Sequence, residues 1–406
     1  MQTPIAVKME NSLVVAATKK KVCNHLPNDI VLFILSKLPL ISLKRFLCVS
    51  KSWSLLFKNT YFMNMLRNNI LLNDDSYYDE TFMVRYTPKY SERCNFYWLS
   101  DEGFANSVHL DWPSQFQEDY IHIFIVGSVS INGILCLKHG FTRTSQVVLW
   151  NPTTSETKVI PPSPIENRRP DRNPWHFLHG FGYDHVSDDY KVIQMIEYFP
   201  GYQGDMIWED RSYDPSWEIY SLKTNSWKKL DIDMQNCYYY SPLQGNGLYA
   251  DGVFHWWAIS KLKNIEECMV SFDFSEEVMC TTLMPLNTDG GFDVGYVERH
   301  LVSLNESIAL ISKYKKESTF CISVLAKLGE RESWINLFTV GPLLSMEYSN
   351  IVGMKNNTLF YRRDGELVCV DLKTQMIKEL GVKGDRFHFH VGKYKKSFLP
   401  IRGIIN

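Results

Sequence analysis

A hairpin pattern that repeats along most of the chain is the feature of this sequence that restricts its fold most strongly. Each copy reads as a strand, a short polar turn and a second strand, which is the pattern of a β-hairpin. The copies span residues 147–161, 218–230, 270–283, 320–335 and 367–380, the fourth being the loosest. Three of the turns align Thr154, Thr224 and Thr374, followed by Lys158, Lys228 and Lys378. Recurrence of this kind indicates a fold built from copies of one unit.

A further turn and strand precede each hairpin. The turn pairs are Asn132-Gly133, Asp188-Asp189, Asp251-Gly252, Asn305-Glu306 and Asn356-Asn357. Gly, Asn and Asp tolerate the positive φ that tight turns require, so their chemistry fits these positions. Units of roughly 40–50 residues with four strands each are typical of the blades of a β-propeller. Five units are recognisable, and we expect residues 80–125 to supply a degenerate sixth.

Residues 26–57 differ from the repeat because they are dense in apolar side chains. A membrane-spanning helix needs about 20 apolar residues, and Lys37, Pro39 and Lys44-Arg45 interrupt this segment. The interruptions predict three short helices instead, with polar caps at Asn28-Asp29, Ser42 and Ser50. Residues 30–35 are apolar around the whole helix, so either the rest of the chain or a partner has to cover them. We expect residues 1–22 to be a disordered tail.

The same segment resembles an F-box. The matching elements are Leu26-Pro27-x-Asp29-Ile30, Ile34-Leu35-x-x-Leu38-Pro39, Leu43-x-Arg45-Phe46 and Cys48-Val49-Ser50-Lys51-x-Trp53. The match departs from the family at residues 40–42, where Leu-Ile-Ser replaces the commoner Val-Lys-Ser. The resemblance implies a trihelical module over residues 23–66 that docks on the Skp-type adaptor of an SCF (Skp–cullin–F-box) ubiquitin ligase. Through the adaptor it would reach the cullin and RING subunits.

The F-box resemblance also implies which side chains contact the adaptor. They are Leu26, Pro27, Ile30, Ile34, Leu35, Leu38, Pro39, Leu43, Phe46, Val49 and Trp53. Burial of one large apolar side chain contributes about 1.5–3 kcal/mol, so a handful of such anchors can hold a complex. The alternative is that these residues form part of the core of the larger domain.

Residues 67–406 resemble the plant F-box-associated interaction domain, which is similar to kelch-type propellers. The matching elements are Asn132-Gly133, residues 149–152, 180–184 and 189–192, His255-Trp256 and residues 332–334; a clean glycine-pair kelch motif is missing. The expected fold is therefore α+β and multidomain: a small all-α trihelical F-box followed by an all-β propeller-like domain of about five to six blades. In this fold we expect Trp150, Trp227 and Trp334 to serve packing.

Three loops depart from the repeat and combine residue types that are common in protein interfaces. They span residues 161–176, 198–217 and 237–241. Tyr, Trp and Arg dominate interface hot spots, and loops on a rigid scaffold often carry binding functions. The candidate substrate-binding residues are therefore Arg168, Arg169, Trp175, Tyr202, Trp208 and Tyr239. Surface loops without a role are the alternative interpretation.

The sequence offers no catalytic or cofactor motif, and we expect no cofactor and no metal site. His176, His179 and His185 cluster without a nearby cysteine. A P-loop, an H-E-x-x-H, a G-x-S-x-G and a Gly-rich dinucleotide turn are all missing. Asp184, Asp188, Asp189 and Asp251 resemble the carboxylates of propeller hydrolases, yet each stands where a turn favours Asp.

Net charge and cysteine content limit the possible partners and the cellular compartment of the protein. A net charge of −2 gives no electrostatic basis for binding nucleic acid. Nine scattered cysteines read as reduced thiols, which indicates the cytoplasm and/or the nucleus. The main hypothesis is a non-catalytic substrate receptor of an SCF-type ligase that captures a protein substrate for ubiquitination and degradation. The alternative is a β-propeller hydrolase or sugar-binding protein with a helical N-terminal cap.

Overall fold

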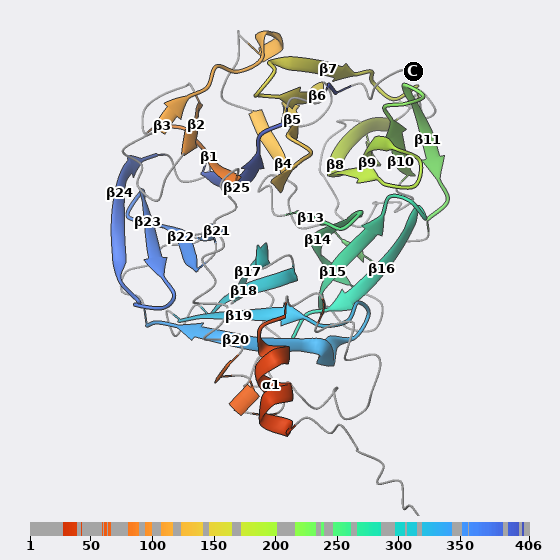
Figure 1. Cartoon of the computed structure of the whole chain (residues 1–406). Helices are drawn as coiled ribbons and strands as arrows, with labels where there is room; N and C mark the ends of the chain where they lie inside the picture. Colours follow the sequence, from red (N-terminus) through yellow and green to blue (C-terminus); the bar gives the residue numbers. More distant parts are fainter. Residues whose placement is uncertain are drawn as a thin grey trace, which may run out of the picture.

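A computed structural model gives the arrangement of most of the chain. It describes residues 27–38, 42, 59, 61–62, 64–65, 80–88, 94–99, 107–116, 123–140, 146–164, 172–200, 216–232, 237–238, 247–260, 266–285, 297–304, 307–314, 319–342, 351–355, 357–384, 389–397 and 400–401. These residues form six antiparallel sheets around a common centre (Figure 1), so the fold is a six-bladed β-propeller. The expectation of five to six blades is confirmed at six.

The blades are numbered I to VI, and their strands are given from the centre outward. Blade I holds β25 (His390–Lys395), β1 (Glu80–Tyr86), β2 (Asn95–Leu99) and β3 (Ser107–His109). Blade II holds β4 (Ile123–Ile131), β5 (Ile134–His139), β6 (Gln146–Asn151) and β7 (Glu156–Ile160). Blade III holds β8 (Arg172–Asp184), β9 (Asp189–Pro200), β10 (Ser216–Ser221) and β11 (Ser226–Leu230).

The second half of the ring follows the same order. In blade IV, β12 (Cys237–Tyr238) and β13 (Leu248–Ala250) pair with β14 (Val253–Ser260), followed by β15 (Glu266–Asp273) and β16 (Val278–Leu283). Blade V holds β17 (Val297–Leu304), β18 (Ser307–Tyr314), β19 (Thr319–Leu325) and β20 (Trp334–Val340). Blade VI holds β21 (Ile351–Lys355), β22 (Thr358–Arg363), β23 (Glu366–Asp371) and β24 (Ile377–Lys383). The helical elements that the structure describes over their full length are α1 (Asn28–Ser36) and the short 3₁₀ turns η3 (Ser114–Phe116) and η7 (Arg331–Ser333).

Blade I is built from both ends of the propeller sequence. Residues 80–109 supply its three outer strands, and β25 supplies the innermost one. β25 pairs antiparallel with β1, where Val391 lies opposite Val84, and meets β4 in a single parallel bridge between Lys393 and Val129. The predicted sixth unit therefore exists, but its fourth strand comes from residues 390–395 and was not foreseen. A pairing between strands so distant in sequence leaves no local signal.

The repeated hairpin turns have a common chemical basis. In blade VI, Oδ1 of Asp371 accepts hydrogen bonds from the backbone N–H groups of Lys373 (3.0 Å) and Thr374 (2.6 Å). Asp273 does the same for Ser275 and Glu276 in blade IV. The last turn residue has a positive φ in four of the hairpins, at Ser155, Asn225, Glu277 and Gln375. A side chain that mimics a backbone turn thus fixes the hairpins of blades IV and VI.

Apolar clusters fill the spaces between adjacent blades and form the core. Trp150 lies between blades I and II and Trp334 between blades IV and V, both buried, while the partly buried Trp227 packs between blades II and III. Two of these indoles also bond to the preceding blade. Nε1 of Trp227 donates to the carbonyl oxygen of Pro161 (2.7 Å), and Nε1 of Trp334 donates to that of Leu283 (3.1 Å). The prediction that these tryptophans serve packing is confirmed.

The glycine motif in residues 180–184 permits close contact between blades III and IV. A Cβ atom at Gly182 would lie 1.9 Å from Cε2 of Phe274, and one at Gly180 would lie 2.6 Å from Cδ1 of Phe254. Both phenylalanines are buried in the cluster between these blades. Only a glycine lets the aromatic rings reach the backbone of β8.

Candidate functional site

The helix α1 lies outside the ring, against the outer part of blade V (Figure 1). The carbonyl oxygen of Pro27 accepts hydrogen bonds from the N–H groups of Ile30 (3.0 Å) and Val31 (3.1 Å). Pro27 is the N-cap and no side chain caps the helix, so the predicted caps at Asn28-Asp29 are wrong. The ring of Pro27 fixes its φ in the range that suits a cap residue. Asp29 lies in the first turn, where its negative charge interacts favourably with the helix dipole. The predicted second and third helices lie in residues that the structure does not describe in full.

One face of α1 belongs to the core of the propeller. Leu35 is buried in the cluster that also contains Val302 and Leu337 of blade V and Leu359 of blade VI. Val31, Leu32 and Leu38 pack against the same cluster. The fully buried side chain of Phe62, whose N–H group is bonded to Oδ1 of Asn59, belongs to it as well. The helical module is therefore anchored on blades V and VI through apolar contacts.

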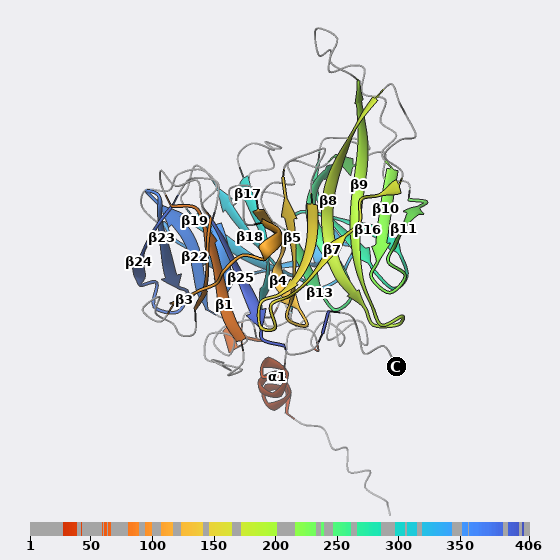
Figure 2. The same ribbon diagram turned by 90° about the horizontal axis from the view of Figure 1, so that it is seen from above.

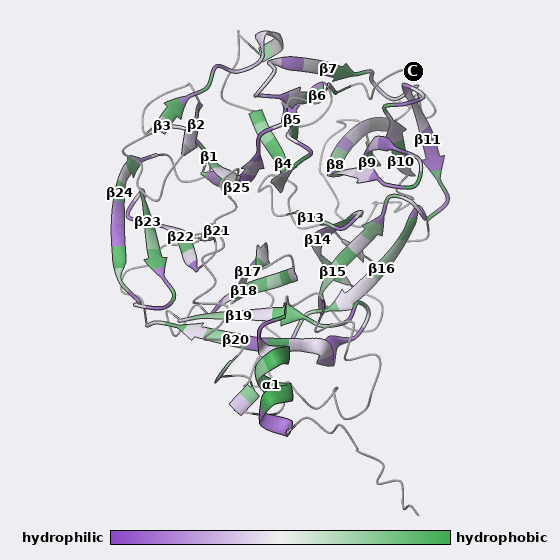
Figure 3. Cartoon of the chain, viewed as in Figure 1, coloured by the Kyte–Doolittle hydropathy of each residue, from purple (hydrophilic) through white to green (hydrophobic). Residues whose placement is uncertain are grey.

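The opposite face of α1 is apolar and exposed. Ile30, Phe33 and Ile34 keep 45%, 55% and 47% of their surface exposed, and Figure 3 shows the strong hydrophobicity of the helix. The spacing i, i+3, i+4 places these three side chains side by side. We call this set the outer face of α1. Such a concentration of large apolar side chains on a small helix marks an interaction site.

The structure divides the predicted adaptor-binding residues into three groups. Pro27, Ile30 and Ile34 are exposed, whereas Leu35 and Leu38 face the propeller. Leu26, Pro39, Leu43, Phe46, Val49 and Trp53 lie outside the described residues. Phe33, the most exposed member of the outer face, was missed by sequence reasoning. Its spacing from Ile30 was the signal that could have found it.

The longest hairpin projects from the side of the propeller away from α1. β8 and β9 extend well beyond the other strands, up to the pairing of Arg172 with Pro200 (Figure 2). Trp175 lies on β8 opposite Glu197, half-buried, with its ring centroid 6.4 Å from that of Phe177. Trp175 is thus part of a strand rather than of a loop, because the ladder continues past it.

The other predicted substrate-binding residues are not placed by the structure. Arg168, Arg169, Tyr202, Trp208 and Tyr239 lie outside the described residues. Residues 237–238 form the short strand β12 paired with β14, so the third predicted loop begins later than expected. Their role in substrate binding stays a prediction.

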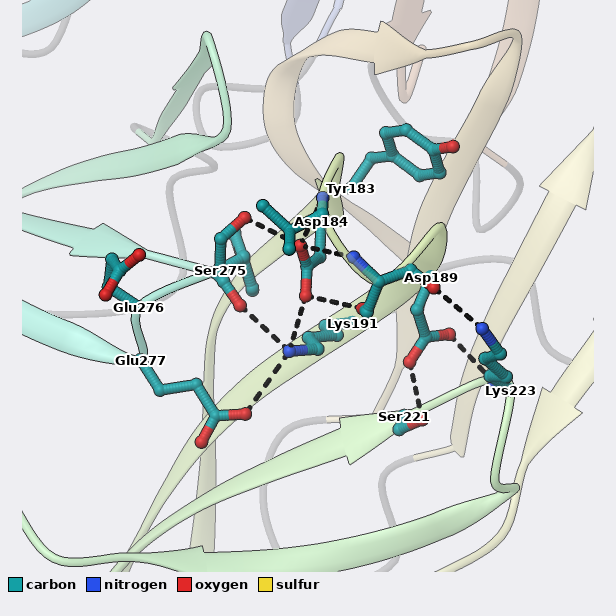
Figure 4. Close-up of polar contacts among 12 residues, drawn as sticks. Tyr183, Asp184, Asp189, Lys191, Ser221, Lys223, Ser275, Glu276 and Glu277 are labelled. Carbon is teal, nitrogen blue, oxygen red and sulfur yellow. Dashed lines mark hydrogen bonds and ion pairs between the residues drawn. The ribbon is translucent and has the colours of Figure 1, made fainter.

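Two of the carboxylates that resembled a hydrolase site, Asp184 and Asp189, are engaged in structural contacts (Figure 4). Asp184 is buried, accepts hydrogen bonds from Ser187 (2.5 Å) and Ser275 (2.6 Å), and lies 2.9 Å from Nζ of Lys191. Burial alone would raise the pKa of Asp184, but these hydrogen bonds outweigh it and hold the pKa well below its ordinary value. Glu277 on the turn of blade IV completes the group at 3.2 Å from Lys191.

Asp188 and Asp189 act in the same way at neighbouring turns. Asp188 accepts a hydrogen bond from the hydroxyl group of Tyr183. Asp189 accepts hydrogen bonds from Ser221 (2.5 Å) and from the N–H group of Lys223 (2.8 Å). In blade III a serine, Ser221, stands where the turns of blades IV and VI have an aspartate, and Asp189 supplies the carboxylate acceptor instead. The cluster of His176, His179 and His185 is divided as well, since His176 and His179 are buried and His185 is exposed.

No three His, Cys, Asp or Glu side chains in the described ranges gather closely enough to hold a metal ion. None of the helices in this part of the chain combines the length and apolarity needed to span a bilayer.

Comparison with known proteins agrees with this geometry. A family model described as "F-box associated beta propeller domain" matches residues 80–400, and one described as "F-box domain" matches residues 23–64. F-box protein CPR1 of Arabidopsis thaliana is 25% identical over 269 residues, which cover 63% of this chain and 63% of that protein. Putative F-box protein At3g17490 of the same plant is 24% identical over 362 residues, covering 86% and 82%. Among solved structures, TolB from Acinetobacter baumannii matches with a TM-score of 0.45 and 11% identity over 81% of this chain and 72% of that one.

The fold and the helix define a protein in two parts, with a small apolar helical module attached to a six-bladed β-propeller. The chain belongs to the plant F-box proteins that carry an F-box-associated β-propeller domain.

Proposed function

We propose that this protein is the substrate-recognition subunit of an SCF-type ubiquitin ligase. The outer face of α1 docks on the Skp-type adaptor, which joins the cullin and RING subunits, and the propeller holds a protein substrate. The observation that carries the proposal is the exposure of Ile30, Phe33 and Ile34 on a helix whose other face is anchored to the propeller. The subunit is non-catalytic and acts by raising the local concentration of the substrate near the conjugating enzyme.

For α1 itself, we propose a narrower adaptor contact than the full set of its residues predicted from the sequence. Ile30, Phe33 and Ile34 reach a partner without any change in the chain, whereas Leu35 and Leu38 would first have to leave the cluster of blades V and VI. We therefore assign the first contact to the outer face and an anchoring role to Leu35 and Leu38. The projecting β8–β9 hairpin on the opposite side leaves room for a substrate while the adaptor is bound.

Nothing in the described residues favours the hydrolase or sugar-binding alternative. Asp184, Asp188 and Asp189 each hold a turn or a neighbouring strand, as shown above. The six cysteines within the described residues carry free thiols, which fits the reducing cytoplasm or nucleus that we propose as the site of action.

Co-purification of the full chain with a Skp-type adaptor tests the proposal. We expect the double substitution Phe33→Glu/Ile34→Glu to abolish the complex, because two carboxylates would be buried in an apolar interface. Val186→Glu is the matched control, since Val186 is 84% exposed on the β8–β9 turn and lies far along the chain from α1. If the double variant still binds the adaptor as strongly as the wild type and Val186→Glu, the proposed docking face is wrong.

A further inference from the structure

Arg85 on β1 carries a buried charge with no opposite charge beside it in the described residues, and the Cys94 thiol is its polar side-chain neighbour. Its side chain is only 3% exposed, and neither Nε nor Nη2 has a hydrogen-bond acceptor. No carboxylate in the described ranges forms an ion pair with it. A guanidinium group stays charged in proteins, and a buried charge is unfavourable unless an opposite charge compensates it. By contrast, the equally buried Arg299 is paired with Glu267 at 2.6 Å.

The groups around Arg85 do not supply the missing negative charge. Burial raises the pKa of the Cys94 thiol, the polar neighbour of Arg85, so it remains a neutral thiol that donates to backbone carbonyl oxygens. The guanidinium carbon lies 5.4 Å from the ring centroid of Phe124 on β4, which offers only a weak cation–π contact. The site therefore holds a cation, a neutral thiol and an aromatic ring.

Two histidines with neutral rings at pH 7 lie on inner strands of the propeller. His390 on β25 lies directly opposite Arg85 in the strand pairing, and His300 lies on β17. Burial lowers the pKa of His390 to about 3, with further lowering by the charges of Arg85 and His300, and burial lowers that of His300 to about 4. As whole residues, His390, His300 and Phe124 are of intermediate burial, whereas Arg85 is buried.

The position of this group is set by the inner strands. β25, β4 and β17 are the innermost strands of blades I, II and V and surround the centre of the ring (Figure 1). β25 runs parallel to β4, and its last residue, Lys395, is bonded to Ser130 near the β4–β5 turn. This end faces α1, as Figure 2 shows, so His390 and Arg85 lie toward the side from which the β8–β9 hairpin projects.

We propose that Arg85, His390 and His300 form a binding site for an oxyanion, a carboxylate or phosphate group, at the end of the propeller centre that faces away from α1. The N–H groups on Nε and Nη2 of Arg85, which have no hydrogen-bond acceptor, suit an oxyanion, because its oxygens match the planar fork of a guanidinium. A bound anion would also favour protonation of the two imidazole rings and so gain further donors. As a substrate contact, which rests on the proposed function, the site selects an acidic or phosphorylated segment of the captured protein.

Thermal unfolding of the full chain in inorganic phosphate, compared with chloride at equal ionic strength and pH 7, tests the site. We expect phosphate to raise the Tm of the wild type in a saturable way. Arg85→Met removes the uncompensated charge, so its Tm in chloride should not fall, and the apparent affinity for phosphate should drop by roughly tenfold or more. Arg363→Met is the control, because Arg363 is paired with Glu379 on the surface of blade VI and its loss should leave the phosphate response unchanged.

A wild type without a phosphate response, or an Arg85→Met variant with an unchanged one, would overturn the proposal. If Arg85→Met does not fold, His390→Gln gives the same test, with a weaker phosphate response expected and an unchanged one contradicting the site. Acetate in place of phosphate distinguishes a preference for carboxylates. Arg85→Met should still co-purify with the Skp-type adaptor, and Phe33→Glu/Ile34→Glu should still respond to phosphate, so the two proposals fail separately.

Discussion

The hydroxyl group of Tyr394 on the last strand lies 2.6 Å from the hydroxyl group of Thr153 in the β6–β7 turn of blade II. Tyr394 is fully buried, and its ring stacks on Trp98 of blade I with centroids 5.5 Å apart. One side chain of β25 thus contacts two blades at the point where the ring closes.

Loss of the hydroxyl group of Tyr394 and loss of its whole ring should lower the stability of the closed propeller by different amounts. We expect Tyr394→Phe to lower the free energy of unfolding by about 1 kcal/mol, the usual contribution of a hydrogen bond. Tyr394→Ala should lower it by about 3–5 kcal/mol, because it also leaves a cavity between blades I and II. Urea denaturation measures both values. Equal losses for the two variants would show that the ring of Tyr394 contributes little to closure.

The ion pairs of Lys191 should contribute more to the free energy of unfolding than the ion pair of its neighbour Lys228. The side chain of Lys191 is 10% exposed and faces Asp184 and Glu277, whereas that of Lys228 is 68% exposed and contacts Glu277 alone. Lys191→Met leaves the buried Asp184 without its cation, while Glu277 keeps Lys228, and should cost about 3 kcal/mol or more; Lys228→Met should cost less than about 1 kcal/mol. Urea denaturation of both variants at pH 7 is the measurement, and a reversed order would contradict the assignment.

The buried histidines should make the propeller sensitive to mild acid. Burial lowers the pKa of His179 to about 4, below the value of about 6.5 in the unfolded chain. The unfolded state therefore takes up the proton first, and stability is lost as the pH falls from about 6.5 toward 4. The expected slope is about 1.4 kcal/mol per pH unit for each such histidine.

His179→Phe isolates this contribution. The ring of His179 packs between Trp217 and Trp256, with centroids at 4.7 Å and 5.3 Å, and phenylalanine can keep these contacts. Between pH 6.5 and 5, the slope of the free energy of unfolding against pH reports how many protons are taken up on unfolding. We expect this number to be smaller by about one in the variant. An unchanged slope would mean that His179 does not titrate in this range.

The two faces of α1 should respond differently to truncation. Leu35→Ala removes a buried side chain from the cluster of blades V and VI and should lower the free energy of unfolding by about 2–5 kcal/mol. Phe33→Ala removes an exposed one and should change it by less than about 0.5 kcal/mol, while weakening adaptor binding. Urea denaturation and adaptor co-purification together separate the two effects. A large loss of stability in Phe33→Ala would place this side chain in the core instead.

The repeat was predictable because its signals are local. Asp371 and Thr374 specify their turn within a few residues, and the same chemistry recurs at Asp273 in blade IV. The closing strand β25 was not predictable, because its partner β1 is distant in sequence and residues 390–395 contain no local pattern that indicates the pairing.

The candidate sites show the same limit. The apolar helix was visible in the sequence, but which of its faces the propeller covers depends on contacts with Val302 and Leu359, which belong to the other end of the chain. Arg85 gave no signal, since an arginine on a strand is ordinarily exposed. Only the packing of blade I against blade II reveals that its charge is buried and unpaired.

The anchoring of α1 on blades V and VI has a consequence for synthesis of the protein. The helix leaves the ribosome before the blades that cover Leu35, and at about 5–20 residues per second the wait lasts roughly ten to sixty seconds. During that time both apolar faces of α1 are bare. An adaptor or chaperone that meets the nascent chain in this interval finds a larger binding surface than the finished protein offers, and later closure of the ring withdraws half of it.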